Sequence, residues 1–352
     1  MYTQFLKNIS VFSKIFKNST LLLTVVSVGL LIMLLISGNL KSNQEIMWSD
    51  TEFECEVTSA EDVEILPIEQ LKTNFENSSI DSKELVITAQ SKNTIPQIVN
   101  PKFSKPNELE KCLASSDIVM LVNYQNITRI YPIKILQQHL IVNDNFADKA
   151  VLISYSILSG SPRAYISEIN DTKIKFGNTG TLFRNNDLFY DYETESLWRQ
   201  FDGKAIAGEL QNKQLEEIPI QLISFTKALS DYPDTEMLNF DTGYQRDYSD
   251  EISFKAYEFD NKILAPIKNP DTSLSPKTKV LGIIYEDKYY AVNIDSFIGT
   301  INAKYATQDL TIELISEAGI IKALLNDEFV NYRFSYWFVW KDFYPETILL
   351  NQ

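Results

Sequence analysis

The sequence predicts an α+β fold that is mostly β, with an N-terminal transmembrane helix followed by two pseudo-repeated β-rich halves with short helices. Three observations predict this. One long stretch near the N-terminus is uncharged. Runs of β-branched and aromatic residues alternate with short polar turns after residue 94. Three segments of the second half resemble segments of the first half in the same order, as expected for related supersecondary units.

The uncharged stretch, residues 18–40, predicts a membrane anchor. A helix of roughly 20 residues crosses the hydrocarbon layer of a membrane, which is about 30 Å thick. Three lysines lie in residues 1–17, which favours a cytoplasmic N-terminus. We therefore expect a basic cytoplasmic tail at 1–17 and a single-pass protein of the cell membrane, with residues 41–352 periplasmic or extracellular. A cleaved signal peptide is the alternative, although residues 36–38 match a cleavage site poorly.

The net charge limits the classes of binding partner, and the two cysteines raise the question of a disulfide. The net charge is -15, and residues 1–40 contain three lysines and no acid, so the remainder carries -18. Such a surface repels nucleic acid, so we expect no nucleic-acid partner, while basic partners and cations stay open. Cys55 and Cys112 have no zinc-site spacing. Outside the cytoplasm they can form one disulfide, and two buried free thiols are the alternative.

The exported part divides into a stalk or lead-in at 41–92, a first β-rich repeat with a unique insert at 93–262, and a second, shorter repeat at 263–352. The matching segments are Ile95–Pro101 with Leu264–Pro270, Met120–Tyr124 with Leu281–Tyr285, and Tyr232–Glu236 with Tyr344–Ile348. The offset is 161 for the second pair and 112 for the third, so the first copy holds 49 residues that the second lacks.

Within the repeats, the pattern predicts hairpins and short helices. The expected strands are Ile118–Tyr124, Ile127–Tyr131, Ala150–Tyr155, Arg163–Ile169, Thr172–Phe176, Val280–Tyr285 and Tyr289–Ile294. The expected helices are Ile133–Leu140, Ser224–Ser230 and Tyr336–Phe343. Pro132 suits the first turn of the first of these helices.

Several motifs together point to a family. They are Asn100–Phe103, Tyr131–Leu136, His139–Asp144, Arg184–Leu188, Tyr190–Asp191, Thr194–Trp198, Gly203–Gly208, Asp241–Tyr244 and Trp337–Thr347. Over residues 94–350 the chain resembles the domain of unknown function 3179 family. The resemblance implies no established activity. Members of that family commonly carry Tyr-Cys-Pro-Leu-Cys-Gly where this chain has Tyr155–Gly160, with Ser156 and Ser159 in place of both cysteines. Serine is a poor substitute for a thiolate as nucleophile, soft metal ligand or redox group.

His139 is the only histidine and matches a family position. It is a candidate metal ligand or proton carrier, and the alternative is a packed helix end. One histidine needs carboxylate or water partners to hold zinc. Asn143 and Asp144 are near enough to serve, although a turn is the favoured interpretation. A catalytic triad would need a nearby serine, such as Ser156 or Ser159, and a buried carboxylate.

The segment Asp187–Glu195 also carries candidates. If it is one extended strand, the carboxylates of Asp187, Asp191 and Glu195, with Glu193, share a face. They could bind a cation or supply two acids for hydrolysis, and a solvated strand face is the alternative. An exposed Trp198 beside a carboxylate would suit a sugar or peptide, and a buried one would fill core.

These observations lead to two hypotheses. The first is a membrane-anchored, exported binding or assembly module without established catalytic activity, with a protein or small-molecule ligand in the 139–200 region. The second is an exported metal-dependent or hydrolytic enzyme that uses His139 and nearby carboxylates. No motif requires a cofactor, and a metal ion stays open. The oligomeric state does not follow from the sequence.

Overall fold

The computed structural model of this chain describes residues 66–67 and 72–350, with gaps at 77, 79, 90, 249–251, 261, 295–301, 307–310, 318–319, 326–327 and 330–331. In 66–67, 252–255 and 302–329 the description covers the backbone alone. The chain divides into two units, Met1–Glu52 and Phe53–Gln352, and all described residues belong to the second. The expected tail 1–17 and transmembrane helix 18–40 lie outside the described residues. Within the described part, no helix combines the length and the apolar character needed to cross a membrane.

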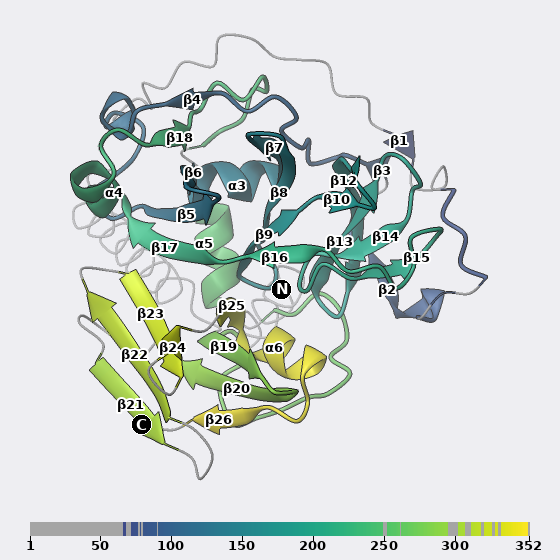
Figure 1. The fold of residues 1–352 in the computed structure, drawn as a ribbon. Coiled ribbons are helices and arrows are strands. Elements are labelled where there is room, and N and C mark those ends of the chain that lie inside the picture. Colours follow the sequence, from purple (N-terminus) through teal and green to yellow (C-terminus); the bar gives the residue numbers. More distant parts are fainter. Residues whose placement is uncertain are drawn as a thin grey trace, which may run out of the picture. The chain divides into compact units, whose positions relative to one another are not determined.

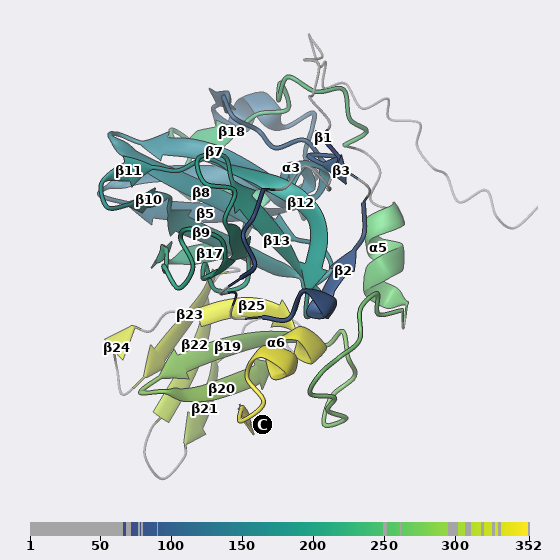
Figure 2. The same cartoon turned by 90° about the vertical axis from the view of Figure 1, so that its right-hand side faces the viewer.

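Strands dominate the described residues and the helices are few and short, which confirms the mostly β, α+β fold (Figures 1 and 2). The α-helices are α3 (Ile133–His139), α4 (Phe225–Asp231), α5 (Ile252–Phe259) and α6 (Trp337–Phe343). Three of them match expected helices, and α5 was not expected. Pro132 precedes α3 with φ of -60°, which is compatible with the start of a helix. Ser224 caps α4 by accepting a hydrogen bond from the backbone N–H of Lys227.

The first repeat is built on a five-stranded sheet in the order β17-β5-β6-β18-β4. Its strands are β4 (Phe103–Ser104), β5 (Ile118–Tyr124), β6 (Ile127–Pro132), β17 (Ile220–Ser224) and β18 (Glu236–Leu238). β5 and β6 form an antiparallel hairpin in which Gln125 and Asn126 both have positive φ, as a two-residue type I′ turn requires. β17 runs antiparallel to β5, and β18 runs parallel to β6.

The second repeat is built on a four-stranded sheet, β25-β19-β20-β26, whose order matches β17-β5-β6-β18 of the first repeat. Its strands are β19 (Lys279–Tyr285), β20 (Lys288–Asn293), β25 (Tyr332–Tyr336) and β26 (Ile348–Leu350). An offset of 161 carries β5 and β6 onto β19 and β20, and an offset of 112 carries β17, α4 and β18 onto β25, α6 and β26. The register corresponds too, because Ser224 pairs with Ile118 as Tyr336 pairs with Lys279. The sheets of the two repeats therefore share strand order, strand direction and register.

Two more sheets are ordered β16-β9-β8-β7 and β15-β14-β13-β12-β2. All of their strands lie between β6 and β17 in the sequence except β2, which comes from the segment before the first repeat. Their strands are β2 (Leu85–Ile87), β7 (Ile141–Phe146), β8 (Lys149–Ser156), β9 (Ser161–Ile166), β12 (Phe176–Phe183), β13 (Asn186–Asp191), β14 (Leu197–Arg199), β15 (Ala205–Ala207) and β16 (Glu216–Ile218). Smaller elements are β1 (Leu66–Pro67), β3 (Ser91–Lys92), β10 (Glu168–Ile169) and β11 (Thr172–Lys173). The second repeat holds β21 (Asn302–Ala306), β22 (Thr311–Glu317), β23 (Ile320–Leu325) and β24 (Glu328–Phe329) there.

Side chains from both repeats share one hydrophobic core. Leu121 and Ile223 of the first repeat belong to the same buried cluster as Leu281 and Ile283 of the second. The repeats are also joined by charge, because Arg333 of β25 forms a bidentate ion pair with Glu217 of β16. We call the junction between the two repeats the seam. Burial of apolar surface and this ion pair stabilise the seam together.

The turn expected at Asn143 and Asp144 is wrong, because both residues lie within strand β7 and are buried. Their side chains are satisfied by tertiary partners. The Asn143 amide donates to the carbonyl oxygen of Phe176 at 2.9 Å and accepts from its N–H at 2.7 Å. The Asp144 carboxylate accepts from Arg129 at 2.7 Å and from the Tyr131 hydroxyl at 2.5 Å. Turn-forming residue types were therefore placed in a strand by contacts distant in sequence.

The condition that Asp187–Glu195 forms one extended strand is not met. β13 ends at Asp191, and a turn follows. The Asp191 carboxylate accepts a hydrogen bond from the backbone N–H of Thr194 at 2.6 Å, which closes this turn. Glu195 then has a positive φ of 53°. The carboxylates of this segment therefore do not line one strand face.

Cys112 is disulfide-bonded and buried. The sequence holds one other cysteine, Cys55, which lies outside the described residues. Cys112 follows the 3-10 helix η3 (Pro106–Leu109) and belongs to the shared hydrophobic core. Of the two alternatives for this cysteine, the buried free thiol is therefore excluded.

Candidate functional site

His139 lies at the end of α3 and is fully buried. Its Nδ1 lies 2.8 Å from the carbonyl oxygen of Pro96, so this nitrogen carries the proton and donates it. Its Nε2 lies 2.7 Å from the Tyr248 hydroxyl and accepts from it. Burial lowers the pKa of His139 from 6.5 to about 4, which keeps the ring neutral. Both ring nitrogens are thus occupied by protein groups, and the residue serves to connect α3 with two loops.

Ser156 and Ser159 lie in a buried polar cluster at the β8–β9 turn. Ser156 donates to the Asp187 carboxylate at 2.6 Å. Ser159 lies 2.5 Å from the Ser161 hydroxyl and accepts from the Asn186 amide at 3.0 Å. The structure therefore brings Ser156, Ser159 and Asp187 together, although these residues are inaccessible to solvent or nearly so.

Asp187 is the unusual titratable group of this cluster. Burial raises its pKa from 3.8 to about 6, and the hydrogen bond from Ser156 opposes that rise. No histidine contacts the Ser156–Asp187 pair, because His139 bonds to Pro96 and Tyr248 instead. A Ser-His-acid triad is therefore not assembled among the described residues.

The other predicted residues are separate from this cluster. Trp198 is buried, packs edge-on against Phe176, and donates its indole N–H to Asp191 at 2.8 Å. Glu195 pairs with the buried Lys92 at 3.2 Å. These contacts assign Trp198 to the core and the acids to local structure. Within the described residues, no group of three or more His, Cys, Asp or Glu side chains could hold a metal ion.

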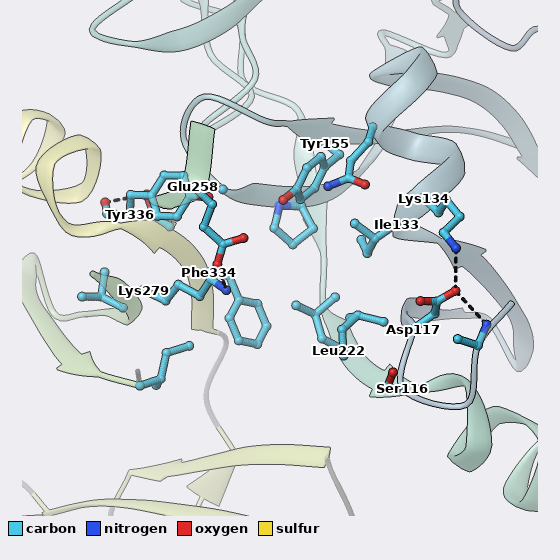
Figure 3. A pocket seen from close by; sticks show the side chains of 18 residues that line it. Ser116, Asp117, Ile133, Lys134, Tyr155, Leu222, Glu258, Lys279, Phe334 and Tyr336 are labelled. Carbon is cyan, nitrogen blue, oxygen red and sulfur yellow. Dashed lines mark hydrogen bonds and ion pairs between the residues drawn. The ribbon is translucent and has the colours of Figure 1, made fainter. Parts of the chain in front are cut away.

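A cavity of about 580 Å³ opens at the seam, and we call it the seam cavity (Figure 3). Its walls come from both repeats at equivalent positions. Leu222 of β17 corresponds to Phe334 of β25 at the offset of 112, and Ile133 corresponds to Ile294 at the offset of 161. Tyr155, at the end of β8, covers the middle of the cavity (Figure 3). The centre of the cavity is therefore apolar and aromatic.

Charged side chains stand at opposite ends of this apolar centre (Figure 3). At one end Lys134 pairs with Asp117 at 2.9 Å, and at the other end Lys279 pairs with Glu258. The Asp117 contacts use Oδ2, which accepts from Lys134 and from the backbone N–H of Ala114. The Glu258 pair uses Oε1. One carboxylate oxygen at each end, Oδ1 of Asp117 and Oε2 of Glu258, thus has no partner among the described residues.

Tyr155 adds a hydroxyl group close to one end. Burial, and then the nearby charge of Glu258, raise the pKa of Tyr155, so its hydroxyl stays protonated. Within the described residues this hydroxyl has no hydrogen-bond partner. A few polar groups around an apolar cavity are the usual composition of a small-molecule site.

The seam cavity was not predicted from the sequence. Only Tyr155, Gly160 and Pro162 of its lining fall within the 139–200 region where a ligand was expected. The remaining lining residues come from segments far apart in sequence, which pairing of the repeats brings together. The equivalence of Leu222 with Phe334 was implicit in the offset of 112, and that of Ile133 with Ile294 in the offset of 161. These two offsets are the signals that could have indicated a shared wall.

Comparison with known proteins identifies a family and nothing more specific. The family model described as "Protein of unknown function (DUF3179)" matches residues 92–333, which is more than half of the chain. This range contains the buried serine cluster, His139 and most of the seam cavity lining. Searches of curated proteins and of solved structures gave no match. The chain belongs to the family of proteins of unknown function described by this model.

Proposed function

We propose that this chain is an exported, membrane-anchored binding module, and that its ligand occupies the seam cavity. The observation that carries the proposal is the cavity itself. It has about 580 Å³, is lined by equivalent residues of both repeats, and combines an apolar centre with a few polar groups. Small-molecule sites typically have about 300–1,000 Å³ and this kind of lining.

The predicted chemical groups support binding more than catalysis. His139 and the serine cluster are buried and bonded to protein partners, whereas the side chains of the seam cavity have polar atoms without partners among the described residues. A catalytic group must reach its substrate. The groups that can reach a ligand in the seam cavity include the carboxylates of Asp117 and Glu258 and the hydroxyl of Tyr155.

The proposed location outside the cytoplasm rests on three features. Residues 18–40 are uncharged, lysines precede them, and Cys112 is disulfide-bonded. Disulfides form and persist mainly outside the cytoplasm. In intact cells, a membrane-impermeant thiol reagent of high mass should therefore shift the chain on a gel only after treatment with a reductant. A shift without reduction would contradict the proposed compartment.

Access to the seam cavity can be tested with one introduced thiol. In Leu222→Cys the new side chain lines the cavity, so a small methanethiosulfonate reagent should modify it rapidly in the full-length chain. Ile223→Cys is the matched control, because Ile223 is the neighbouring residue and is 1% exposed in the core. Native cysteines are controlled by the wild-type chain. Equal modification rates of the two variants would contradict an accessible cavity.

A further inference from the structure

We propose that the seam cavity selects an elongated organic dication, an α,ω-diamine with an ammonium group at each end of an apolar chain. This inference rests on the proposed function, because it names the ligand class of the same cavity. Its basis is the position of the two carboxylates. Asp117 and Glu258 lie at opposite ends of the cavity in Figure 3, with Leu222 and Phe334 between them.

Each end offers an acceptor for an ammonium group. Oδ1 of Asp117 and Oε2 of Glu258 are carboxylate oxygens without a partner among the described residues, and the other oxygen of each group is held by a lysine. The lysine fixes the carboxylate in place but does not use all of its acceptor sites. Hydrogen bonds between an ammonium and a carboxylate are about twice as strong as neutral ones. Near Glu258, the Tyr155 hydroxyl provides a second acceptor.

The centre of the cavity accepts methylene groups. Ile118, Ile133 and Leu222 contribute aliphatic wall, and Phe334 and Tyr336 contribute rings. A methylene group buried against such a surface contributes about 0.8 kcal/mol. A compact dication would lack these contacts, and an apolar molecule without charged ends would leave the carboxylate oxygens unused. An apolar chain with a cationic group at each end satisfies both requirements.

The net negative charge of the exported part also favours a cationic ligand. Residues outside 1–40 carry a net charge of -18. Such a surface raises the local concentration of cations and speeds their association.

A zwitterionic ligand, such as a short peptide with free ends, is the main alternative to a diamine, because each end of the cavity also has a lysine. Substitution of Lys279 separates the two ligands by the sign of its effect.

The experiment is calorimetric titration of the full-length chain, in a non-ionic detergent, with diamines of increasing length. We expect an optimum length, and we expect 1,6-diaminohexane to bind about tenfold or more tightly than hexylamine, because the second ammonium gains a charged hydrogen bond. Glu258→Gln and Asp117→Asn should each weaken diamine binding about tenfold. The matched control is Glu216→Gln, an exposed glutamate on β16 that does not line the cavity and should change nothing.

Lys279→Met is the decisive variant, because Lys279 is half-exposed and competes for Glu258. Its removal should strengthen diamine binding several-fold and weaken binding of leucyl-leucine. Weaker diamine binding in this variant, or tighter binding of the dipeptide than of any diamine, would overturn the ligand class. If no diamine binds but hexylamine or the dipeptide slows modification of Leu222→Cys, the ligand class fails and the cavity remains a binding site. If Leu222→Cys is also unreactive, the proposed function fails as well.

Discussion

A methyl group added at Gly282 would collide with the ring of Trp340. Gly282 lies in the middle of β19, and α6 lies beside this strand (Figures 1 and 2). Trp340 of α6 is fully buried, and its ring is next to Gly282. A Cβ at position 282 would lie 2.2 Å from two atoms of the indole ring, where ordinary contacts are 3.4–4 Å. The helix or the ring must therefore move by more than 1 Å. The variant Gly282→Ala measures the cost of that movement.

Two opposing effects set the expected change in the free energy of unfolding. Overpacking of a dense core costs about 1–3 kcal/mol, and a rigid, fully buried ring places this site at the upper end. Glycine in a strand is itself less stable than alanine by roughly 0.5–1 kcal/mol, which offsets part of the cost. We therefore expect Gly282→Ala to lower the free energy of unfolding by about 2 kcal/mol. The control Ile284→Ala, on the same strand at 37% exposure, should cost less than about 1 kcal/mol.

The first repeat suggests a compensating variant. At the equivalent positions it has Leu121 in β5 and Ala228 in α4, so the large and small partners are exchanged between sheet and helix. Trp340→Ala alone should cost about 3–5 kcal/mol. The double variant Gly282→Leu with Trp340→Ala places the leucine and alanine of the first repeat at these two positions. Its free energy of unfolding should exceed the value expected from the sum of the two single changes by more than about 1 kcal/mol.

Urea denaturation followed by circular dichroism measures these differences for the purified full-length chain. Wild-type stability in Gly282→Ala would refute the close packing of α6 on β19. Strict additivity in the double variant would refute the equivalence of the two helix–sheet contacts.

Three further variants test two buried polar groups and one half-buried glutamate, each by urea denaturation at several pH values. The pKa of His139 is about 4 in the fold against 6.5 when exposed, so wild-type stability should fall by about 3 kcal/mol as the pH falls from 6.5 through 4, and His139→Gln should remove that slope. The pKa of Asp187 is raised from 3.8 to about 6, so its contribution is present below pH 3.8 and is lost as the pH rises through 6. Asp187→Asn, which can still accept the serine hydrogen bond, should then be more stable than wild type at pH 7.5, by up to about 3 kcal/mol, and similar to it near pH 4. Glu217→Gln removes the counter-charge of Arg333 at the seam and should cost about 1–3 kcal/mol, whereas the exposed neighbour Glu216→Gln should cost almost nothing. Unchanged pH profiles, or equal costs for the two glutamates, would contradict these assignments.

The hairpins and short helices could be predicted because their signals are local. Ile118–Tyr124 has the β-branched and aromatic composition of a strand, and Gln125 and Asn126 adopt the positive φ that a two-residue turn needs. α3 begins after Pro132 as expected. The offsets of 161 and 112 also corresponded to equivalent strands and helices, because they record which segments share a role in the sheet.

The interpretation failed where distant contacts override local preference. Asn143 and Asp144 favour turns, but Phe176 and Arg129 hold their side chains within β7. The alternation of acids after Asp187 suggested a strand, but an Asp-x-x-Thr sequence carries its own turn signal, in which Asp191 accepts from the Thr194 N–H. That signal was available in the sequence.

The site was harder to predict than the fold. The sequence singled out His139 and the serines because of their residue types. In the structure these side chains form hydrogen bonds with other buried groups of the protein. The seam cavity is instead made of common residues, such as Leu222 and Phe334, whose proximity depends on how the repeats pack. A cavity between two related sheets leaves no motif in either one.

Hydrogen exchange of the full-length chain, with and without the tightest-binding diamine, tests the central claim most directly. Binding in the seam cavity should slow exchange in peptides that contain Asp117, Leu222 and Phe334, because these residues line it from both repeats. Peptides from β13 and β14, around Asp191 and Trp198, should exchange at the same rate in both samples. Protection confined to β13 and β14, or to one repeat alone, would contradict a ligand site shared between the two halves.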